Sequence, residues 1–402
     1  MTSATVTGSG ALISHRPSHA GLLQDGSEVP VPAGRSRHGR PDAIIVPATR
    51  PASALSGVID LAAASGATIV ALCSGQANRA QVADRIGRAI GARGIVVEVD
   101  DDYALPGLRF ETSSDVFAKV SGGRTSDLSV KRNVGLLLAR MQGWRKIVFV
   151  DDDITLSGQD VHRLAYQLES HQIVGMACRD FPDNSVFCHA RRLARLPQDV
   201  FVTGAVLGVN CDDVLPFFPD IYNEDWFFFA EAAARHRLTK VGEARQKGYL
   251  PFADPLRANH EEFGDLLAEG LYALIELWPP PTNRRRLASF FPTILSLATE
   301  KYWETFIDVR RRDLDFTRQR LEKFTERKSC SDEVWAAQKS LEVAEARYTD
   351  DDSITAGRCV EFLEAWQRDL VRWKTTHQGA RKVDKTGDAL DRLGLTTWEP
   401  VR

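Results

Sequence analysis

The chain alternates short apolar runs with helical segments in its first quarter, and this alternation restricts the fold more than any other feature. Runs rich in Ile, Val and Ala at 43–46, 68–72 and 94–99 are separated by segments of helical periodicity at 53–64 and 77–90. Such an order of strand, helix, strand, helix and strand is typical of a parallel sheet with helices on both faces. We therefore predict that the chain folds around an α/β domain.

Three consecutive aspartates follow a later apolar run. The run at 146–150 leads directly into Asp151, Asp152 and Asp153, and ligands of open parallel sheets bind at the carboxyl ends of the strands. Adjacent carboxylates raise one another's pKa unless a cation compensates them. Mg²⁺ or Mn²⁺ prefers hard oxygen ligands and commonly joins one or two carboxylates to phosphates. We expect Asp151 and Asp153 to hold such an ion; the alternative is a solvated acidic turn before the next helix.

A second acidic pair, Glu224 and Asp225, lies between an aromatic, proline-flanked segment and the aromatic run 226–229. Partial desolvation by these aromatic residues would raise the pKa of a carboxyl group, which suits a general base that accepts a proton from a hydroxyl. The alternative is that the two acids begin a helix, where they oppose the helix dipole. The two interpretations are compatible.

Basic and polar residues precede these acids, and two histidines are candidate metal ligands. Lys and Arg near a helix N-terminus favour an anionic phosphate. His260 ranks first as a ligand because it follows a Pro- and Asp-rich loop at the start of a predicted helix over 261–278, and His189 is its competitor. The basic and polar group comprises Thr49, Arg50, Arg124, Lys131, Arg132 and Asn133.

Together these features resemble the GT-A glycosyltransferases, and in particular their inverting, family 2-like branch. Residues 46–51 (VPATRP) are similar to the V-P-x-x-x-x-P of the family's first strand, and 131–135 (KRNVG) are similar to its R-N-x-G helix. Residues 147–154 (IVFVDDDI) match its hydrophobic strand and D-x-D motif. Residues 203–225, which end in Asn-Glu-Asp, resemble its acceptor-side segment. The resemblance covers about residues 42–277.

This resemblance implies a Rossmann-like GT-A domain with a mostly parallel central sheet, which transfers one sugar from a nucleotide-sugar donor to an acceptor hydroxyl with inversion. Asp225, beside Glu224, would be the catalytic base. Asp151 and Asp153 would hold Mn²⁺ or Mg²⁺ on the donor diphosphate, with His260 as a further ligand. UDP is the expected nucleotide, with GDP next, and the acceptor would be a small molecule or a glycan. The residues implied in donor binding are Pro47, Thr49, Arg50, Lys131, Arg132, Asn133, Asp151 and Asp152.

The predicted organisation has four parts. A flexible N-terminal arm covers residues 1–40, the GT-A nucleotide-sugar transferase domain covers 41–282, an all-α C-terminal extension covers 283–380, and a weakly ordered tail covers 381–402. The extension is predicted because apolar residues recur there at helical spacing. We expect its helices to form a homo-oligomer interface, an acceptor platform or a buttress.

Charge and cysteine content exclude other classes of protein. The 51 Lys and Arg residues against 54 Asp and Glu leave a net charge of −3, so nucleic acid is not an expected partner. The six cysteines contain no C-x-x-C pair, which indicates reduced thiols in the cytoplasm. The uncharged stretch at 287–299 contains a proline and is too short for a transmembrane helix, and we expect no cleaved secretory signal.

Three other functions fit parts of the sequence. Residues 151–156 (DDDITL) also fit the D-x-D-x-T-L motif of haloacid dehalogenase-type phosphohydrolases, with Asp151 as nucleophile and Asp153 as acid. In a retaining GT-A transferase, Asp225 would not act as a base. A metal- or nucleotide-sensing protein with a partner-binding helical tail is the non-enzymatic alternative. A phospho-enzyme at Asp151, the anomeric configuration of the product, and nucleotide binding without turnover would distinguish them.

Overall fold

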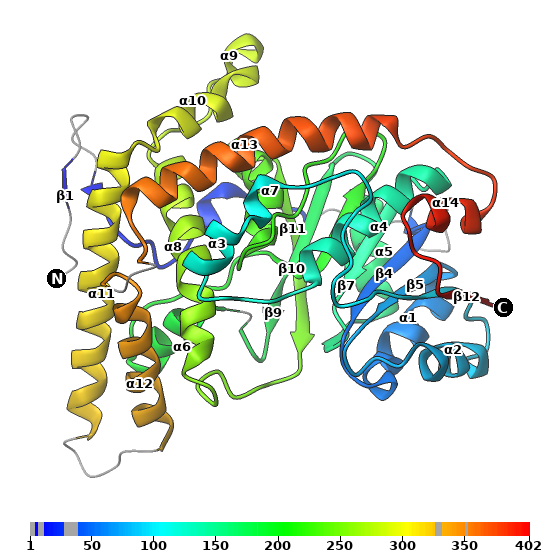
Figure 1. The fold of residues 1–402 in the computed structure, drawn as a ribbon, viewed down its shortest axis with the longest axis horizontal. Coiled ribbons are helices and arrows are strands. Elements are labelled where there is room, and N and C mark those ends of the chain that lie inside the picture. Colours follow the sequence, from blue (N-terminus) through cyan, green and yellow to red (C-terminus); the bar gives the residue numbers. More distant parts are fainter. Residues whose placement is uncertain (1–4, 7–11, 28–38, 183, 326–331, 350–352) are drawn as a thin grey trace.

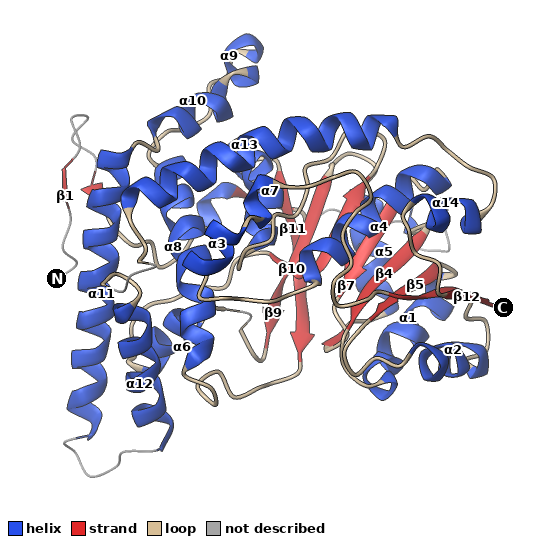
Figure 2. Cartoon of the chain, viewed as in Figure 1, coloured by secondary structure: helices blue, strands red, loops and turns tan. Residues whose placement is uncertain are grey.

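Among the residues that the structure describes, ten strands form a mixed central sheet with helices on both faces (Figures 1 and 2). The structure is a computed structural model that describes residues 5–6, 12–27, 39–182, 184–325, 332–349 and 353–402. The order is β12-β6-β5-β4-β7-β10-β9-β11-β3, and β8 pairs with β11. In chain order the strands are β3 (Leu23–Asp25), β4 (Ala43–Ala48), β5 (Thr68–Cys73), β6 (Gly94–Glu98), β7 (Lys146–Val150), β8 (Ile154–Thr155), β9 (Ile173–Arg179), β10 (Thr203–Asn210), β11 (Leu238–Gln246) and β12 (Trp398–Val401).

One strand near the middle of the sheet, β10, runs opposite to both of its neighbours. β6, β5, β4 and β7 are parallel neighbours, as are β9, β11 and β3. β10 lies antiparallel between β7 and β9, so its first residues lie beside the last residues of β7. The predicted α/β class with a mostly parallel sheet is confirmed in this mixed form. A separate antiparallel pair joins β1 (Thr5–Val6) and β2 (Leu12–Ile13).

The sheet is buried on both faces because alternate strand residues point to opposite sides. Ile44 and Val46 of β4 belong to a core that includes the first two helices and α5, whereas Ile45 belongs to the larger core on the other side. The α-helices that precede β11 in the chain are α1 (Ser56–Ser65), α2 (Arg79–Arg88), α3 (Asp115–Val120), α4 (Leu128–Gln142), α5 (Gly158–Gln167), α6 (Val186–Leu193) and α7 (Glu224–Ala234).

The C-terminal helices share the larger core with the sheet. Trp303, Phe362 and Trp366 pack in the same buried cluster as Ile45 and Phe149, so the hydrophobic core does not divide at the predicted boundary of residue 283. None of the helices in the described part of the chain is long and apolar enough to cross a membrane. These helices are α8 (Leu256–Glu276), α9 (Arg284–Ala288), α10 (Phe290–Leu297), α11 (Glu300–Thr325), α12 (Asp332–Ala346), α13 (Ala356–Gly379) and α14 (Thr386–Arg392).

Two terminal segments are more ordered than predicted. Within the expected flexible arm, β3 pairs with β11 and Leu22 is buried; residues 1–4, 7–11 and 28–38 of that arm lie outside the described residues. Within the expected weakly ordered tail, α14 is followed by β12, which pairs antiparallel with β6. Both strands gain their hydrogen bonds from distant partners, which local sequence patterns do not reveal.

Helix α13 holds the long connection between β6 and α4. Its buried Asp369 accepts hydrogen bonds from the backbone N–H groups of Glu111 and Thr112 at 2.9 and 2.8 Å, and from the Thr112 hydroxyl at 2.9 Å. The Trp373 indole donates to the Leu215 carbonyl at 2.9 Å. Helix α13 therefore fixes a connection that continues into the candidate site.

His377, in the last turn of α13, is fully buried. Neither ring nitrogen has a hydrogen-bond partner, and the ring centroid lies 5.7 Å from that of Trp373. Burial, together with the positive charge of Arg140, lowers the pKa of His377 to about 4. The folded protein therefore holds this imidazole in its neutral form.

Candidate functional site

A cavity of about 840 Å³ opens where several strands end. It lies at the carboxyl ends of β4, β5, β7 and β11, beside the first residues of β10 and the start of α7. This is the edge at which ligands of open α/β sheets bind. Among the described residues, its lining is Pro47, Thr49, Arg50, Ser74, Gly75, Asp101, Arg124, Thr125, Ser126, Asp127, Leu128, Arg132, Asp151, Asp152, Asp153, Asn184, Phe201, Val202, Thr203, Ala205, Tyr222, Asn223, Glu224, Asp225, Trp226 and Gln246.

The structure brings most of the sequence-predicted site residues to this one cavity. Both acidic groups line it, although they are separated by more than seventy positions. Lys131, Asn133 and His260 are not among its described lining residues. The predicted residues that do line it are Pro47, Thr49, Arg50, Arg124, Arg132, Asp151, Asp152, Asp153, Glu224 and Asp225.

Arg132 of α4 connects the two acidic groups. Its Nη2 lies 3.1 and 3.2 Å from the two carboxylate oxygens of Asp151, and its Nη1 donates to Glu224. Burial alone would lower the pKa of Arg132, but the charges of Asp151, Glu224 and Asp225 raise it above its ordinary value. A permanent positive charge therefore lies between the acids of β7 and those of α7.

Arg50 and the backbone after β4 hold the other two aspartates. The buried Asp152 carboxylate accepts from the backbone N–H groups of Thr49 at 2.9 Å and Arg50 at 2.8 Å, and also from the Arg50 guanidinium. Arg50 Nη2 donates to Asp153 Oδ2 at 2.9 Å. Asp152 therefore ties the β4 and β7 ends together, while Arg50, whose side chain is 47% exposed, faces the cavity.

Asp225 is held in the first turn of α7 by two backbone donors. Gly204 N–H donates to Asp225 Oδ2 at 2.6 Å, and Trp226 N–H donates to Oδ1 at 2.9 Å. A Cβ at Gly204 would lie 2.6 Å from Arg132 Nη1 and 2.8 Å from Asp225 Cβ, so only glycine permits this close packing. Glu224 and Asp225 also begin the helix, as the alternative interpretation of the sequence predicts.

The turn that starts α7 has an unusual backbone conformation. Asn223 adopts a left-handed conformation, with φ of 62°, which asparagine tolerates better than most residues. Its side-chain amide donates to Asp265 Oδ1 of α8 at 3.1 Å. The orientation of the two acids therefore depends on α8 as well as on α7.

Lys131 and Asn133 of α4 are buried behind the site. Lys131 Nζ lies 2.7 Å from Asp127 Oδ2 and donates to Ser74 Oγ at 2.6 Å. Asn133 makes two hydrogen bonds with the backbone of Phe218, at 2.8 and 2.9 Å. Lys131 thus places Ser74 and Asp127 at the cavity, and Asn133 holds the chain before α7.

His260 lies within α8 and not at the helix entrance, because α8 begins at Leu256. His260 is partly buried. The side-chain amide of the preceding residue, Asn259, donates to the Gly122 carbonyl at 3.1 Å. The role of His260 as a metal ligand stays a prediction.

The residues beside the acid triplet form a donor set made of oxygen atoms. Gln246 donates to Asp153 Oδ2 at 3.4 Å, while its own buried Oε1 has no hydrogen-bond partner. Asp151 remains 23% exposed toward the cavity. Such a set fits Mg²⁺ or Mn²⁺, which completes its coordination with phosphate and water oxygens.

Sequence reasoning did not find Ser74, Asp127, Gly204 and Gln246. Ser74, Asp127 and Gln246 line the cavity, and Gly204 supports Asp225 from behind it; each is hydrogen-bonded to a residue distant in sequence. No family model matches the chain, and comparison with curated proteins gives no significant match. The GT-A resemblance therefore rests on the motifs and their positions.

Proposed function

We propose that this chain is a metal-dependent glycosyltransferase that moves one sugar from a nucleotide-sugar donor, with a UDP-sugar expected, to an acceptor hydroxyl with inversion. The proposal rests on one observation: the two acidic groups line the same cavity. Asp151 and Asp153 line it from the end of β7, and Asp225 lines it from α7, with Arg132 between them. This arrangement offers cationic groups for a leaving diphosphate and a carboxylate for an attacking hydroxyl.

Asp225 would accept the proton of the acceptor hydroxyl. The hydroxyl oxygen would form a bond to the anomeric carbon while the bond from that carbon to the diphosphate breaks on the opposite face. The backbone N–H groups of Gly204 and Trp226 hold the carboxylate in one orientation, which is the requirement for a general base.

The leaving diphosphate needs positive charge at the other side of the cavity. Arg50 and Arg132 would supply fixed charges there, and arginine binds phosphate oxygens in a bidentate manner. Asp151 and Asp153 would hold Mn²⁺ or Mg²⁺, with Gln246 Oε1 as a further oxygen. When bound, the ion supplies charge stabilisation for the departing phosphate.

Two substitutions separate catalysis from donor binding. Asp225→Asn should leave nucleotide binding nearly intact and lower transfer by about 100-fold or more, since general bases contribute at least that factor. Asp153→Ala should instead weaken metal-dependent nucleotide binding itself. Glu231→Gln changes an acid of the same helix that does not line the cavity, and it should behave as wild type.

The assay begins with a thermal-shift screen of UDP-, GDP- and dTDP-sugars with and without Mn²⁺, because ligands that bind the folded state raise its apparent stability. Transfer is then measured with the donor that binds, and the anomeric configuration of the product is determined by NMR. Wild-type turnover by Asp225→Asn, or a product with retained configuration, would refute the assignment of Asp225 as the base.

A further inference from the structure

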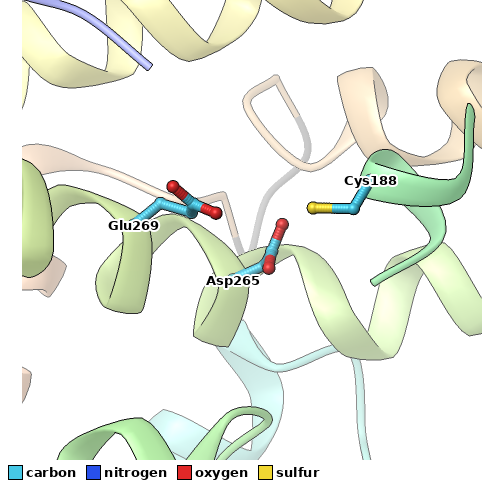
Figure 3. A group of neighbouring side chains, drawn as sticks. All are labelled: Cys188, Asp265 and Glu269. Atoms are coloured by element: carbon cyan, nitrogen blue, oxygen red, sulfur yellow. The ribbon is translucent and has the colours of Figure 1, made fainter. Parts of the chain in front are cut away.

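A second group of polar side chains is buried between α6, α8 and the N-terminal segment. Cys188 Sγ and one carboxylate oxygen each of Asp265 and Glu269 lie within 4.8 Å of one another, and all three residues are buried. Asp265 and Glu269 are one turn apart on α8, and Figure 3 shows their carboxylates and the Cys188 sulfur directed into the same space. None of the three is among the described residues that line the cavity.

The His15 ring lies beside Glu269 of this group. The His15 side chain is only 2% exposed, and its Nδ1 lies 3.6 Å from Glu269 Oε2 without a hydrogen-bond partner. Its Nε2 lies at hydrogen-bond distance, 3.1 Å, from Gln198 Oε1, which fixes the ring with Nδ1 toward the acid. A buried ring nitrogen without a partner costs free energy unless a ligand binds it.

We infer that His15, Cys188, Asp265 and Glu269 form a structural Zn²⁺ site. Zn²⁺ binds thiolate, imidazole and carboxylate ligands in a tetrahedral arrangement, and structural zinc sites supply four protein ligands. The sulfur and nitrogen ligands favour Zn²⁺ over Mg²⁺ or Mn²⁺. On binding, Cys188 loses its thiol proton to solvent and a Zn–S bond forms, with no change in oxidation state.

The charged side chains around the group carry a net negative charge, which a bound cation would compensate. The carboxylates of Glu262, Asp265, Glu269 and Glu276 are in contact with two arginines, Arg16 and Arg310, and with His19, so there is one carboxylate in excess even when His19 is counted as a cation. Binding of a divalent ion with loss of one thiol proton adds one positive charge. Arg310 and Ser185 also donate to Asp265 Oδ2, at 2.6 and 2.9 Å, and such second contacts orient metal ligands.

The ion would join three segments that are distant in sequence. His15 belongs to the N-terminal segment, Cys188 to α6, and the two acids to α8, whose Asp265 also accepts from Asn223 at the start of α7. The site would therefore stabilise the support of Asp225 without touching substrate. It does not depend on the proposed transferase activity.

The test measures metal in the purified full chain. After dialysis against a weak chelator, inductively coupled plasma mass spectrometry should find about one zinc per chain. After replacement of zinc by Co²⁺, the protein should show a thiolate-to-Co²⁺ charge-transfer band in the near ultraviolet. No cysteine occurs among the described residues that line the candidate active site, so this band would not arise from a metal bound there.

Cys188→Ser should remove the band and the stoichiometric zinc. Cys359→Ser, which changes another fully buried cysteine, should keep both. Zinc retained by Cys188→Ser, or wild-type protein that binds neither Zn²⁺ nor Co²⁺ with a thiolate band, would overturn the site. The wild-type spectrum decides the matter even if Cys188→Ser fails to fold.

Discussion

Removal of the buried His377 imidazole should make the protein less sensitive to acid. Burial and the charge of Arg140 lower the pKa of His377 from 6.5 to about 4. Below pH 6.5 the unfolded chain binds a proton that the folded chain does not, so this histidine costs stability as the pH falls from about 7 to about 4. The cost approaches about 3 kcal/mol at low pH, since each pKa unit is worth about 1.4 kcal/mol.

The variant His377→Leu removes the titrating group and keeps an apolar side chain beside Trp373. At about pH 5 the linkage relation gives a loss of about 2 kcal/mol from His377 alone. Wild type should therefore lose about 2 kcal/mol more than His377→Leu between pH 7 and pH 5 in equilibrium urea unfolding. His189, whose pKa burial and Arg257 lower to about 3, is present in both proteins, so its contribution cancels in the difference.

The control is Val371→Leu, which changes an exposed apolar residue of the same helix without altering a titrating group and should follow the wild-type pH dependence. Equal losses in wild type and His377→Leu would refute the reasoning. An NMR titration of folded wild type in which the His377 ring protonates near pH 6.5 would contradict it independently.

Two further substitutions test the packing around the site. Gly204→Ala should displace Arg132 and Asp225 and cost about 1–3 kcal/mol by overpacking, with a loss of transfer near 100-fold. Gly57→Ala, whose Cβ in α1 would make only an ordinary van der Waals contact of 4.0 Å with the Ile154 carbonyl oxygen, should keep activity and stability in the same assays. Asp369→Ala should leave the N–H groups of Glu111 and Thr112 without their carboxylate partner and lower the free energy of unfolding by about 3 kcal/mol in urea. A loss below about 1 kcal/mol would show that α13 does not fix this connection.

The sequence predicts the parallel half of the sheet because that half follows from local patterns. Each strand from β4 to β7 is a continuous apolar run, and such a run indicates a strand buried on both faces. The position of the aspartate triplet then follows from strand direction. The strands β3 and β12 could not be predicted in this way, because their hydrogen bonds depend on partners far along the chain.

The candidate site was only partly predictable for a similar reason. Residues 131–139 of α4 are all buried, so no polar face shows that Arg132 points into the cavity while Lys131 and Asn133 do not. The apolar spacing predicts His260 at a helix entrance, whereas α8 begins earlier, at Leu256. Residue type identified the candidates, but long-range packing determined which of them meet.

The Arg132 guanidinium forms ion pairs with carboxylates from two different elements, the end of β7 and the start of α7. The two halves of the cavity are therefore interdependent. A ligand that draws Asp151 away from Arg132 leaves more of that positive charge to Glu224 and Asp225. By thermodynamic reciprocity, a molecule bound near α7 must then alter affinity at the β7 end by the same factor. Occupants of the two halves would consequently change each other's affinity, whichever of them binds first.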